Sequence, residues 1–349
     1  MKKNKSIGIF GLGYVGRPLY ELFKNKDYLV KGYDIDPAKS IHTLSEMKKL
    51  KYYIVTVPTP IKNKKPDLSF LEKATRTIKK LNKKAIIIYE STVYPGVTEN
   101  LSKKFNIKYY GYSPERISPG EKERVKERLI SANSKKILKK IDKLYSSIGF
   151  NTIKVDIKIA EAAKVLENTQ RDLNIALMNE IDLLFRKDNI NTKEVIKAAS
   201  SKWNFYEVYP GLVGGHCIAV DPYYLIDYAK SKKEKLSMVK KARKINNKRI
   251  DFIVNKILKH KNKKVLLIGK TYKANVKDTR ESGALKIYKK LKNKIKIKNF
   301  DVLIDSEKKL KKIKKFKPQI IVILVDHYNS KDKLIKEFKK IEYVLDYSL

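Results

Sequence analysis

The sequence predicts an α/β fold in which two domains with parallel sheets are joined by a long central helix. Three observations predict it. Short apolar strands alternate with helical stretches from residue 6 to about residue 112, and the alternation resumes near residue 263. Between them, residues 158–187 keep helical spacing and contain no proline or glycine. A chain of 349 residues is also long for a single core, which favours two or three domains.

The N-terminal region carries a dinucleotide-binding pattern. The predicted strand Ser6–Phe10 leads into Gly11-Leu-Gly-Tyr-Val-Gly16, a helix over residues 18–26, and a second strand, Leu29–Tyr33, that ends at Asp34. The glycines let the backbone approach a pyrophosphate, and the helix N-terminus attracts it. Asp34 lies 18 residues past the last glycine, near the position of a carboxylate that bonds a ribose diol and disfavours the 2′-phosphate of NADP. The predicted fold here is Rossmann-like, and the predicted cofactor is NAD.

The alternation continues through three more predicted strands, each of which runs into a polar loop. In an open α/β sheet, ligands bind at the carboxyl ends of the strands, so these loops should face the cofactor or the substrate. The strands are Tyr53–Val57, Ala85–Tyr89 and Tyr109–Tyr112, and the loops begin at Pro58, Glu90 and Ser113.

The central helix is predicted from about Lys158 to Lys187, and it suits a domain spacer and a dimer surface. Lys164 and Asn168 are four residues apart and share one face of it. From the residues alone, a solvated lysine and a surface asparagine remain an open interpretation. Its small and large apolar residues recur at helical spacing, namely Ala162, Ala163, Leu166, Leu173, Ala176, Leu177, Ile181 and Leu184.

The C-terminal region repeats the first domain without its glycine triplet. Predicted strands cover Lys264–Gly269, Ile295–Phe300, which ends at Asp301, and Ile320–Val325, which ends at Asp326-His327. A second Rossmann-like domain whose ligand is not a dinucleotide is therefore expected. The predicted domains are a nucleotide-binding domain at 1–155, a central helical domain at 156–255 and a C-terminal domain at 256–349.

Cys217 is the only cysteine in the chain, and it follows two glycines in the segment Pro210–Pro222. It cannot form an intramolecular disulfide or half of a Cys-x-x-Cys metal clip, and no metal site is predicted. Two interpretations remain from this segment: a small buried hydrophobic residue, or a nucleophile held against a substrate, with Asp221 four residues on.

The composition excludes several classes of function. The formal net charge is +43, but the lysines are spread along the whole chain rather than clustered among aromatic residues, so no nucleic-acid partner is predicted. No apolar run approaches the roughly 20 residues of a membrane span. A single cysteine, and a basic N-terminus that leads directly into a strand, predict a cytoplasmic protein.

Five separated motifs, in order, make the chain resemble the nucleotide-sugar 6-dehydrogenases of the UDP-glucose and GDP-mannose dehydrogenase superfamily. The resemblance runs from Gly8 to about His327. The residues of the motifs are most similar to those of members that oxidise UDP-N-acetylhexosamines. The chain is shorter than is usual for the family, notably between Gly120 and Ser134. The motifs are Gly-Leu-Gly-Tyr-Val-Gly at 11–16, Val-Pro-Thr-Pro at 57–60, Glu-Ser-Thr-Val-Tyr-Pro-Gly at 90–96, Gly-Tyr-Ser-Pro-Glu-Arg-Ile-Ser-Pro-Gly at 111–120 and Gly-Gly-His-Cys at 214–217.

The resemblance implies two successive hydride transfers to NAD from a C6 alcohol, through an aldehyde, to a carboxylate. An aldehyde has no readily transferable hydride until a nucleophile adds to it, so Cys217 is expected to form a thiohemiacetal and then a thioester. By the same resemblance Lys164 and Asn168 stabilise the oxyanion, Asp221 with Thr92 holds and activates a water, and Glu115 acts in thioester hydrolysis. His216, next to the cysteine, is expected to be structural.

The resemblance also implies two sets of binding residues. The expected cofactor-binding residues are Gly11, Gly13, Tyr14, Val15, Gly16, Asp34, Lys39, Val57, Thr59, Thr92 and Arg280. The expected substrate-binding residues are Glu115, Arg116, Ile117, Lys164, Asn168, Tyr209, Gly211, Gly214 and Lys273.

The expected substrate is a UDP-N-acetylhexosamine, with UDP-N-acetylglucosamine first and UDP-N-acetylgalactosamine second. The product would serve a bacterial surface polysaccharide such as a capsule or O-antigen, and the family resemblance implies a homodimer. Four alternatives stay open: UDP-glucose as substrate, UDP-N-acetylmannosamine as substrate, a two-electron β-hydroxyacid dehydrogenase, and a basic nucleic-acid-binding protein.

Overall fold

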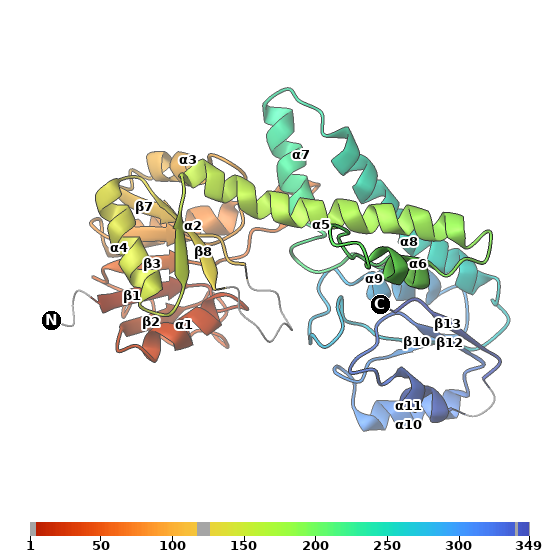
Figure 1. The fold of residues 1–349 in the computed structure, drawn as a ribbon. Helices are drawn as coiled ribbons and strands as arrows, with labels where there is room; N and C mark the ends of the chain where they lie inside the picture. Colours follow the sequence, from red (N-terminus) through yellow and green to blue (C-terminus); the bar gives the residue numbers. More distant parts are fainter. Residues whose placement is uncertain (1–4, 117–125, 339–340, 349) are drawn as a thin grey trace. The chain divides into compact units, whose positions relative to one another are not determined.

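The computed structural model describes residues 5–116, 126–338 and 341–348. It confirms the predicted α/β class, with two parallel-stranded sheet regions and a long helix between them in sequence (Figure 1). Two compact units make up the chain. Unit 1 comprises residues 1–167 and 223–234, and unit 2 comprises residues 168–222 and 235–349.

The sheet of unit 1 has the strand order β2-β1-β3-β6-β7-β8-β9. The pairing is parallel except between β7 and β8, which run antiparallel. Strands β1, β3 and β6 are buried on both faces, as expected where helices cover both sides of a parallel sheet. The strands are β1 (Ser6–Phe10), β2 (Leu29–Tyr33), β3 (Tyr52–Val55), β6 (Ile86–Tyr89), β7 (Tyr109–Tyr112), β8 (Glu127–Ala132) and β9 (Asn151–Lys154).

Two apolar clusters pack on the opposite faces of this sheet. One contains Tyr53, Tyr89 and Leu71 of α2, and the other contains Ile9, Leu19 of α1 and Tyr145. Each helix presents one apolar face to its cluster, which is why the amphipathic pattern is readable from the sequence. The helices are α1 (Gly16–Lys24), α2 (Ser69–Leu81), α3 (Val97–Lys104) and α4 (Lys135–Ser146), and a short hairpin pairs β4 (Ile61–Lys62) with β5 (Lys65–Pro66).

The sheet of unit 2 has the order β11-β10-β12-β13, and every pair in it is parallel. Its strands are β10 (Val265–Ile268), β11 (Ile297–Phe300), β12 (Ile320–Ile323) and β13 (Tyr343–Asp346). The helices of this unit are α6 (Thr192–Ala199), α8 (Ser237–Leu258), α9 (Gly283–Leu291), α10 (Glu307–Phe316) and α11 (Lys331–Lys336).

The two sheets share one structural device at the end of their first strand. Gly11 follows β1 with a φ of 94°, and Gly269 follows β10 with a φ of 96°. In each sheet an aspartate at the end of the neighbouring strand accepts a backbone N–H from the loop that follows the glycine: Asp34 from Leu12 at 2.7 Å, and Asp301 from Lys270 at 2.6 Å. The second sheet thus repeats the turn of the first without its glycine triplet.

Helix α5 (Ile157–Phe185) is continuous, and the boundary between the two compact units falls inside it, between Glu167 and Asn168 (Figure 1). Helix α7 (Asp221–Ser231) likewise begins in unit 2 and continues in unit 1. The predicted division at residues 155 and 255 remains a prediction.

Candidate functional site

The glycine loop of unit 1 is shaped by two close backbone approaches. A Cβ on Gly16 would lie 1.8 Å from the carbonyl oxygen of Gly11, and one on Gly11 would lie 2.8 Å from that of Thr56. The Thr56 hydroxyl donates to the Gly11 carbonyl at 2.6 Å and holds the turn. Gly13, by contrast, has no atom within 4 Å of its Cβ position. The residues therefore fit a dinucleotide: two glycines close the turn, and the third leaves space for a pyrophosphate at the start of α1.

Asp34 is half-buried at the end of β2, where the expected ribose-binding carboxylate belongs. Its Oδ2 accepts from the Leu12 amide at 2.7 Å and its Oδ1 accepts from the Asp36 amide at 2.9 Å. These two bonds orient the carboxylate beside the glycine loop. A phosphate at this position would meet a fixed negative charge.

We therefore expect NAD to be preferred over NADP by at least about tenfold in kcat/KM, or roughly 1.4 kcal/mol. Steady-state rates of NADH and NADPH formation with the same UDP-sugar measure the preference. Equal catalytic efficiency with the two cofactors would refute this role for Asp34.

The other residues expected at the cofactor lie in unit 1, except Arg280. Tyr14 is exposed and Val15 half-buried just before α1. Two strand-end loops are tied together: the Thr59 hydroxyl donates to the Thr92 carbonyl at 2.9 Å, and Ser91 donates to the Val57 carbonyl at 2.7 Å. The exposed Lys39 forms an ion pair with Asp36 at 2.7 Å.

Glu115 follows β7 and is among the buried charged residues of unit 1. Its Oε2 lies 3.2 Å from Nη1 of Arg128 in β8, and its Oε1 accepts from the Arg116 amide at 2.7 Å. Arg128 also forms an ion pair with Glu90 at 2.6 Å. Arg128 and Glu90 were not predicted as site residues, because a buried ion pair leaves no periodic trace in the sequence. Nearby, Arg116 bonds Glu167 of α5 at 2.9 Å, and Ile117 lies outside the described residues.

Burial raises the pKa of the Glu90 carboxyl from 4.5 to about 7, in spite of the opposing charge of Arg128. The folded chain therefore keeps a proton that the unfolded chain releases above about pH 4.5. The resulting stability is fully present below that pH and is lost as the pH rises through about 7.

The Glu90→Gln variant, which is neutral at every pH, should consequently change the pH dependence of stability. Relative to this variant, the wild type should lose on the order of 3 kcal/mol of unfolding free energy between pH 4.5 and 7. Urea melts of both proteins at several pH values measure the difference. A constant offset between them would show that Glu90 ionises normally in the fold.

Helix α5 buries several polar side chains beside a few apolar ones. Glu161 accepts the Gly96 amide at 2.5 Å and the Thr98 amide at 2.8 Å, so it binds the N-terminus of α3. Lys164 is buried one turn further along the helix. In unit 2, Asp172 accepts from Arg243 of α8 at 2.6 Å. Buried hydrogen bonds thus hold each part of the helix within its own unit. In unit 1 the Glu161 bonds fix the helical turn that precedes Lys164.

In unit 2 the structure brings together three of the predicted catalytic residues. The Asn168 amide donates to Oδ2 of the buried Asp221 at 2.6 Å. The Asp221 backbone N–H donates to the carbonyl of Cys217 at 2.8 Å, which makes the cysteine part of the turn that begins α7. Cys217 is exposed, so the interpretation as a buried small hydrophobic residue is wrong. An accessible thiol thus stands beside an oriented carboxylate–amide pair.

The segment before the cysteine is held by close backbone contacts. The Gly211 amide and carbonyl both bond the Asn179 side chain of α5, at 2.9 and 3.0 Å. A Cβ on Gly214 would lie 2.9 Å from the Glu281 carbonyl oxygen. Tyr209 is half-buried, and its hydroxyl donates to Glu207 at 2.6 Å. The Asn179 bonds and the close approach to Glu281 hold the loop that carries Cys217 against α5 and the turn before α9.

The loops after β10 and β12 supply the remaining predicted residues. Lys273 is half-buried, and its carbonyl accepts from Thr271 at 3.0 Å. Arg280 is half-exposed and pairs with Asp278 at 2.6 Å. His216 is exposed; desolvation, together with the charge of Arg280, lowers its pKa, which keeps the imidazole neutral at neutral pH. His327 is buried and its ring bonds Asp301, so it braces the strand ends.

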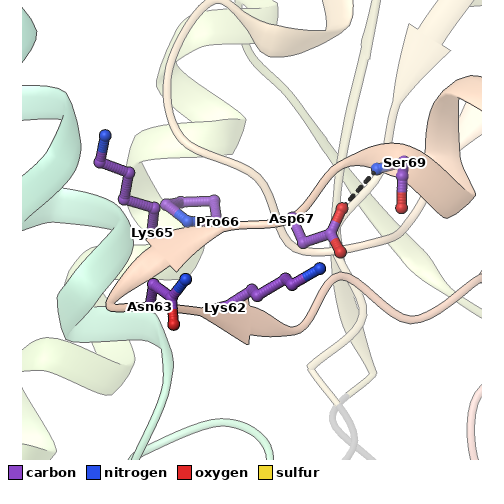
Figure 2. A pocket seen from close by; sticks show the side chains of 6 residues that line it. All are labelled: Lys62, Asn63, Lys65, Pro66, Asp67 and Ser69. Atoms are coloured by element: carbon purple, nitrogen blue, oxygen red, sulfur yellow. Dashed lines mark hydrogen bonds between the residues drawn. The ribbon is translucent and has the colours of Figure 1, made fainter.

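Two surface hollows of the described chain are lined by other residues than these. One of about 520 Å³ lies at the β4–β5 hairpin, where the Ser69 amide donates to Asp67 at 3.0 Å (Figure 2). It is lined by Lys62, Asn63, Lys65, Pro66, Asp67 and Ser69. Among residues 5–116, 126–338 and 341–348, no helix has the length and apolar character that crossing a membrane requires, and no cluster of three metal-ligating side chains occurs.

The glycine loop fits a dinucleotide, and the second sheet repeats its turn without the glycine triplet. These features define a nucleotide-binding protein with two Rossmann-like sheets. Family models agree. Those for the NAD-binding, central and UDP-binding domains of the UDP-glucose/GDP-mannose dehydrogenase family match residues 40–149, 158–248 and 266–348. The chain belongs to this family and is an NAD-dependent UDP-sugar dehydrogenase.

Relatives and solved structures match nearly the whole chain. UDP-N-acetyl-D-glucosamine 6-dehydrogenase of Salmonella typhi is 37% identical over 97% of this chain and 94% of its own. The enzyme of the same name from Pseudomonas aeruginosa is 40% identical over 87% and 84%. The solved UDP-D-ManNAc dehydrogenase of Pyrococcus horikoshii superposes with a TM-score of 0.87 at 29% identity, over 98% of this chain and 95% of that one.

Proposed function

We propose that the protein oxidises C6 of a UDP-N-acetylhexosamine to the uronic acid in two successive two-electron steps. UDP-N-acetylglucosamine is the first candidate substrate and UDP-N-acetylgalactosamine the second. The observation that carries the proposed reaction is the exposed Cys217 in the turn that begins α7, bonded through its carbonyl to Asp221. A two-electron hydroxyacid dehydrogenase would give this thiol no chemical role.

In this proposal Cys217 acts on the aldehyde formed by the first oxidation. Its thiolate adds to the carbonyl carbon and gives a thiohemiacetal, which loses hydride and becomes a thioester. Water then attacks the acyl carbon, the carbon–sulfur bond breaks, and the carboxylate leaves while the thiol is regenerated. When bound at the glycine loop, NAD accepts the hydride at each oxidation.

The remaining residues take the roles that their environments suit. Lys164 and Asn168 stabilise the oxyanion of each tetrahedral species by charge and hydrogen bonding. Asp221, with Thr92, holds the water, and Glu115 accepts its proton. The Asn168–Asp221 bond supports the pairing of these two roles, because it orients both side chains before substrate binds.

NAD would be held by Gly11, Gly13 and Gly16 at the pyrophosphate and by Asp34 at the ribose, with Tyr14, Val15, Lys39, Val57, Thr59 and Arg280 completing the site. The UDP-sugar would be held by Arg116, Tyr209, Gly211, Gly214 and Lys273. Ile117, also proposed as a substrate contact, lies outside the described residues.

The acetamido substrate is supported by the two relatives named as N-acetylglucosamine dehydrogenases, which are the more similar in sequence. The resemblance to a UDP-D-ManNAc dehydrogenase structure makes the manno isomer the main alternative. The uronic acid product would enter a surface polysaccharide, such as a capsule or O-antigen.

Catalytic efficiency with four UDP-sugars tests this choice. UDP-N-acetylglucosamine should exceed UDP-glucose by at least about a hundredfold in kcat/KM, because a site shaped for an acetamido group leaves its polar partners unpaired when that group is missing. UDP-N-acetylgalactosamine and UDP-N-acetylmannosamine complete the series. If UDP-glucose surpassed all three acetamido sugars, the substrate assignment would be wrong.

A homodimer built on α5 is the second proposal. Leucines 166, 177 and 184 of α5 are 60%, 52% and 56% exposed in the monomer, and with Leu173 they follow a spacing of 7, 4 and 7 residues. That spacing is typical of a helix-pairing seam. Light scattering at micromolar concentration should give twice the chain mass of 40.5 kDa. The Leu177→Glu variant should shift towards monomer, and a monomeric wild type would be fatal to the proposal.

A further inference from the structure

A buried group of three charged side chains in unit 1 includes an arginine that lies outside the motifs from which the site residues were inferred. Arg128 of β8 stands between two carboxylates, Glu90 after β6 and Glu115 after β7. The side chains are 3%, 0% and 9% exposed. A charged arginine facing two ionised acids leaves one unit of negative charge uncompensated, which is costly in a buried site.

The sheet topology explains why these side chains meet. Strands β7 and β8 run antiparallel, with Gly111 opposite Ala132 and Tyr112 opposite Ser131. Continuing that register three residues further sets Glu115 opposite Arg128. The reversal of strand direction in an otherwise parallel sheet therefore delivers an arginine to the strand-end loop that carries Glu115.

The Arg128 guanidinium is fixed on every side. Its Nε donates to the Ser113 hydroxyl at 2.8 Å, its Nη1 to Glu115 at 3.2 Å, and its Nη2 lies 2.6 Å from Glu90. The guanidinium also lies over two aromatic rings, 4.4 Å from the centroid of Tyr145 and 4.9 Å from that of Phe150. Close contact with aromatic rings together with several directed N–H bonds uses properties of arginine that lysine lacks.

We infer that Arg128 is a positioning residue for the hydrolytic step: it holds the Glu115 carboxylate in place, while Glu90 anchors the opposite edge of the guanidinium. The inference rests on the proposed role of Glu115 as the acceptor of the proton from the attacking water. Tyr145 donates its hydroxyl to Glu90, which completes the set of titratable groups that face this arginine. The remaining charge is offset in part by a proton, because burial raises the pKa of Glu90 to about 7.

The test separates the hydrolytic step from the oxidations. In Arg128→Met, the first NADH should form at the wild-type rate, while hydrolysis of the Cys217 thioester slows about a hundredfold. The acyl-enzyme should then accumulate and be visible by mass spectrometry of the acid-quenched protein. UDP-N-acetylglucosamine serves as substrate, and thermal melts report folding.

Because Arg128→Met leaves two carboxylates without a cation, the double variant Arg128→Met/Glu90→Gln is made in parallel and keeps a single buried acid. Arg128→Lys should keep part of the wild-type hydrolysis rate. Glu90→Gln, in which Arg128 keeps its bond to Glu115, should keep most of it. Wild-type hydrolysis in the folded double variant would overturn the inference. The Glu115→Gln variant distinguishes an error in the proposed role of Glu115 from an error in the role of Arg128. If this variant also hydrolyses normally, the proposed role of Glu115 is wrong; if it is slow while the double variant is fast, only the role of Arg128 is wrong.

Discussion

Replacing Cys217 with serine should lower steady-state formation of the uronic acid by at least about a thousandfold. A serine hydroxyl does not ionise near neutral pH as a thiol does, so it adds poorly to the aldehyde and makes no thioester. NAD binding should be unchanged, because Cys217 is not among the residues proposed to hold the cofactor. Coupled assays of NADH and acid, with NAD titration as the control, measure the two effects.

The serine variant also reports on where the reaction stops. Oxidation of the alcohol to the aldehyde does not need the thiol. The serine variant can therefore still form one NADH for each sugar, slowly. Full turnover to the acid by Cys217→Ser would rule out the thioester route. Cys217→Ala removes any residual nucleophile and should behave in the same way.

Adding a methyl group at Gly16 should strongly weaken the binding of NAD. Its Cβ would lie 1.8 Å from the Gly11 carbonyl oxygen and 2.6 Å from the Thr56 hydroxyl, and the backbone atom cannot move without opening the turn. We expect Gly16→Ala to weaken NAD binding by at least about a hundredfold, or roughly 2.7 kcal/mol, and to lower the melting temperature.

Gly13→Ala is the matched control, since the added Cβ has no neighbour within 4 Å. It should leave the melting temperature unchanged and weaken NAD binding alone, because its methyl group enters the space left for the pyrophosphate. An equal loss of stability in the two variants would contradict this account. It would show that both substitutions weaken NAD binding by destabilising the loop rather than by filling the space for the cofactor. Calorimetric titration with NAD and thermal melts distinguish these cases.

The sequence predicted well the elements whose pattern is local. The strands Ser6–Phe10, Leu29–Tyr33 and Tyr109–Tyr112 have their predicted bounds, because each is a short apolar run ended by glycine, acid or proline signals. Strands β8, β9 and β13 were missed. They carry charged residues and are partly exposed, so their place depends on pairing with distant strands.

The candidate site divides in the same way. Motif residues such as Gly16, Asp34 and Cys217 are identifiable because their chemistry depends on residue type and spacing. The residues that hold these motifs in place are not identifiable from the sequence. Glu161, Arg128 and Asn179 are ordinary polar residues, and their role depends on their burial in the folded chain. On α5 the apolar residues at helical spacing predicted a dimer surface, which stays a prediction, and the buried polar side chains such as Glu161 and Asp172 were not predicted. A one-dimensional pattern does not distinguish leucines that pack within the chain from leucines that stay at its surface.

The stoichiometry of NADH to UDP-sugar consumed tests the four-electron reaction most directly. With UDP-N-acetylglucosamine limiting and NAD in excess, the proposed route through a Cys217 thioester predicts two NADH and one uronic acid for each sugar nucleotide, with no free aldehyde. One NADH per sugar, with the aldehyde as the final product, would contradict it.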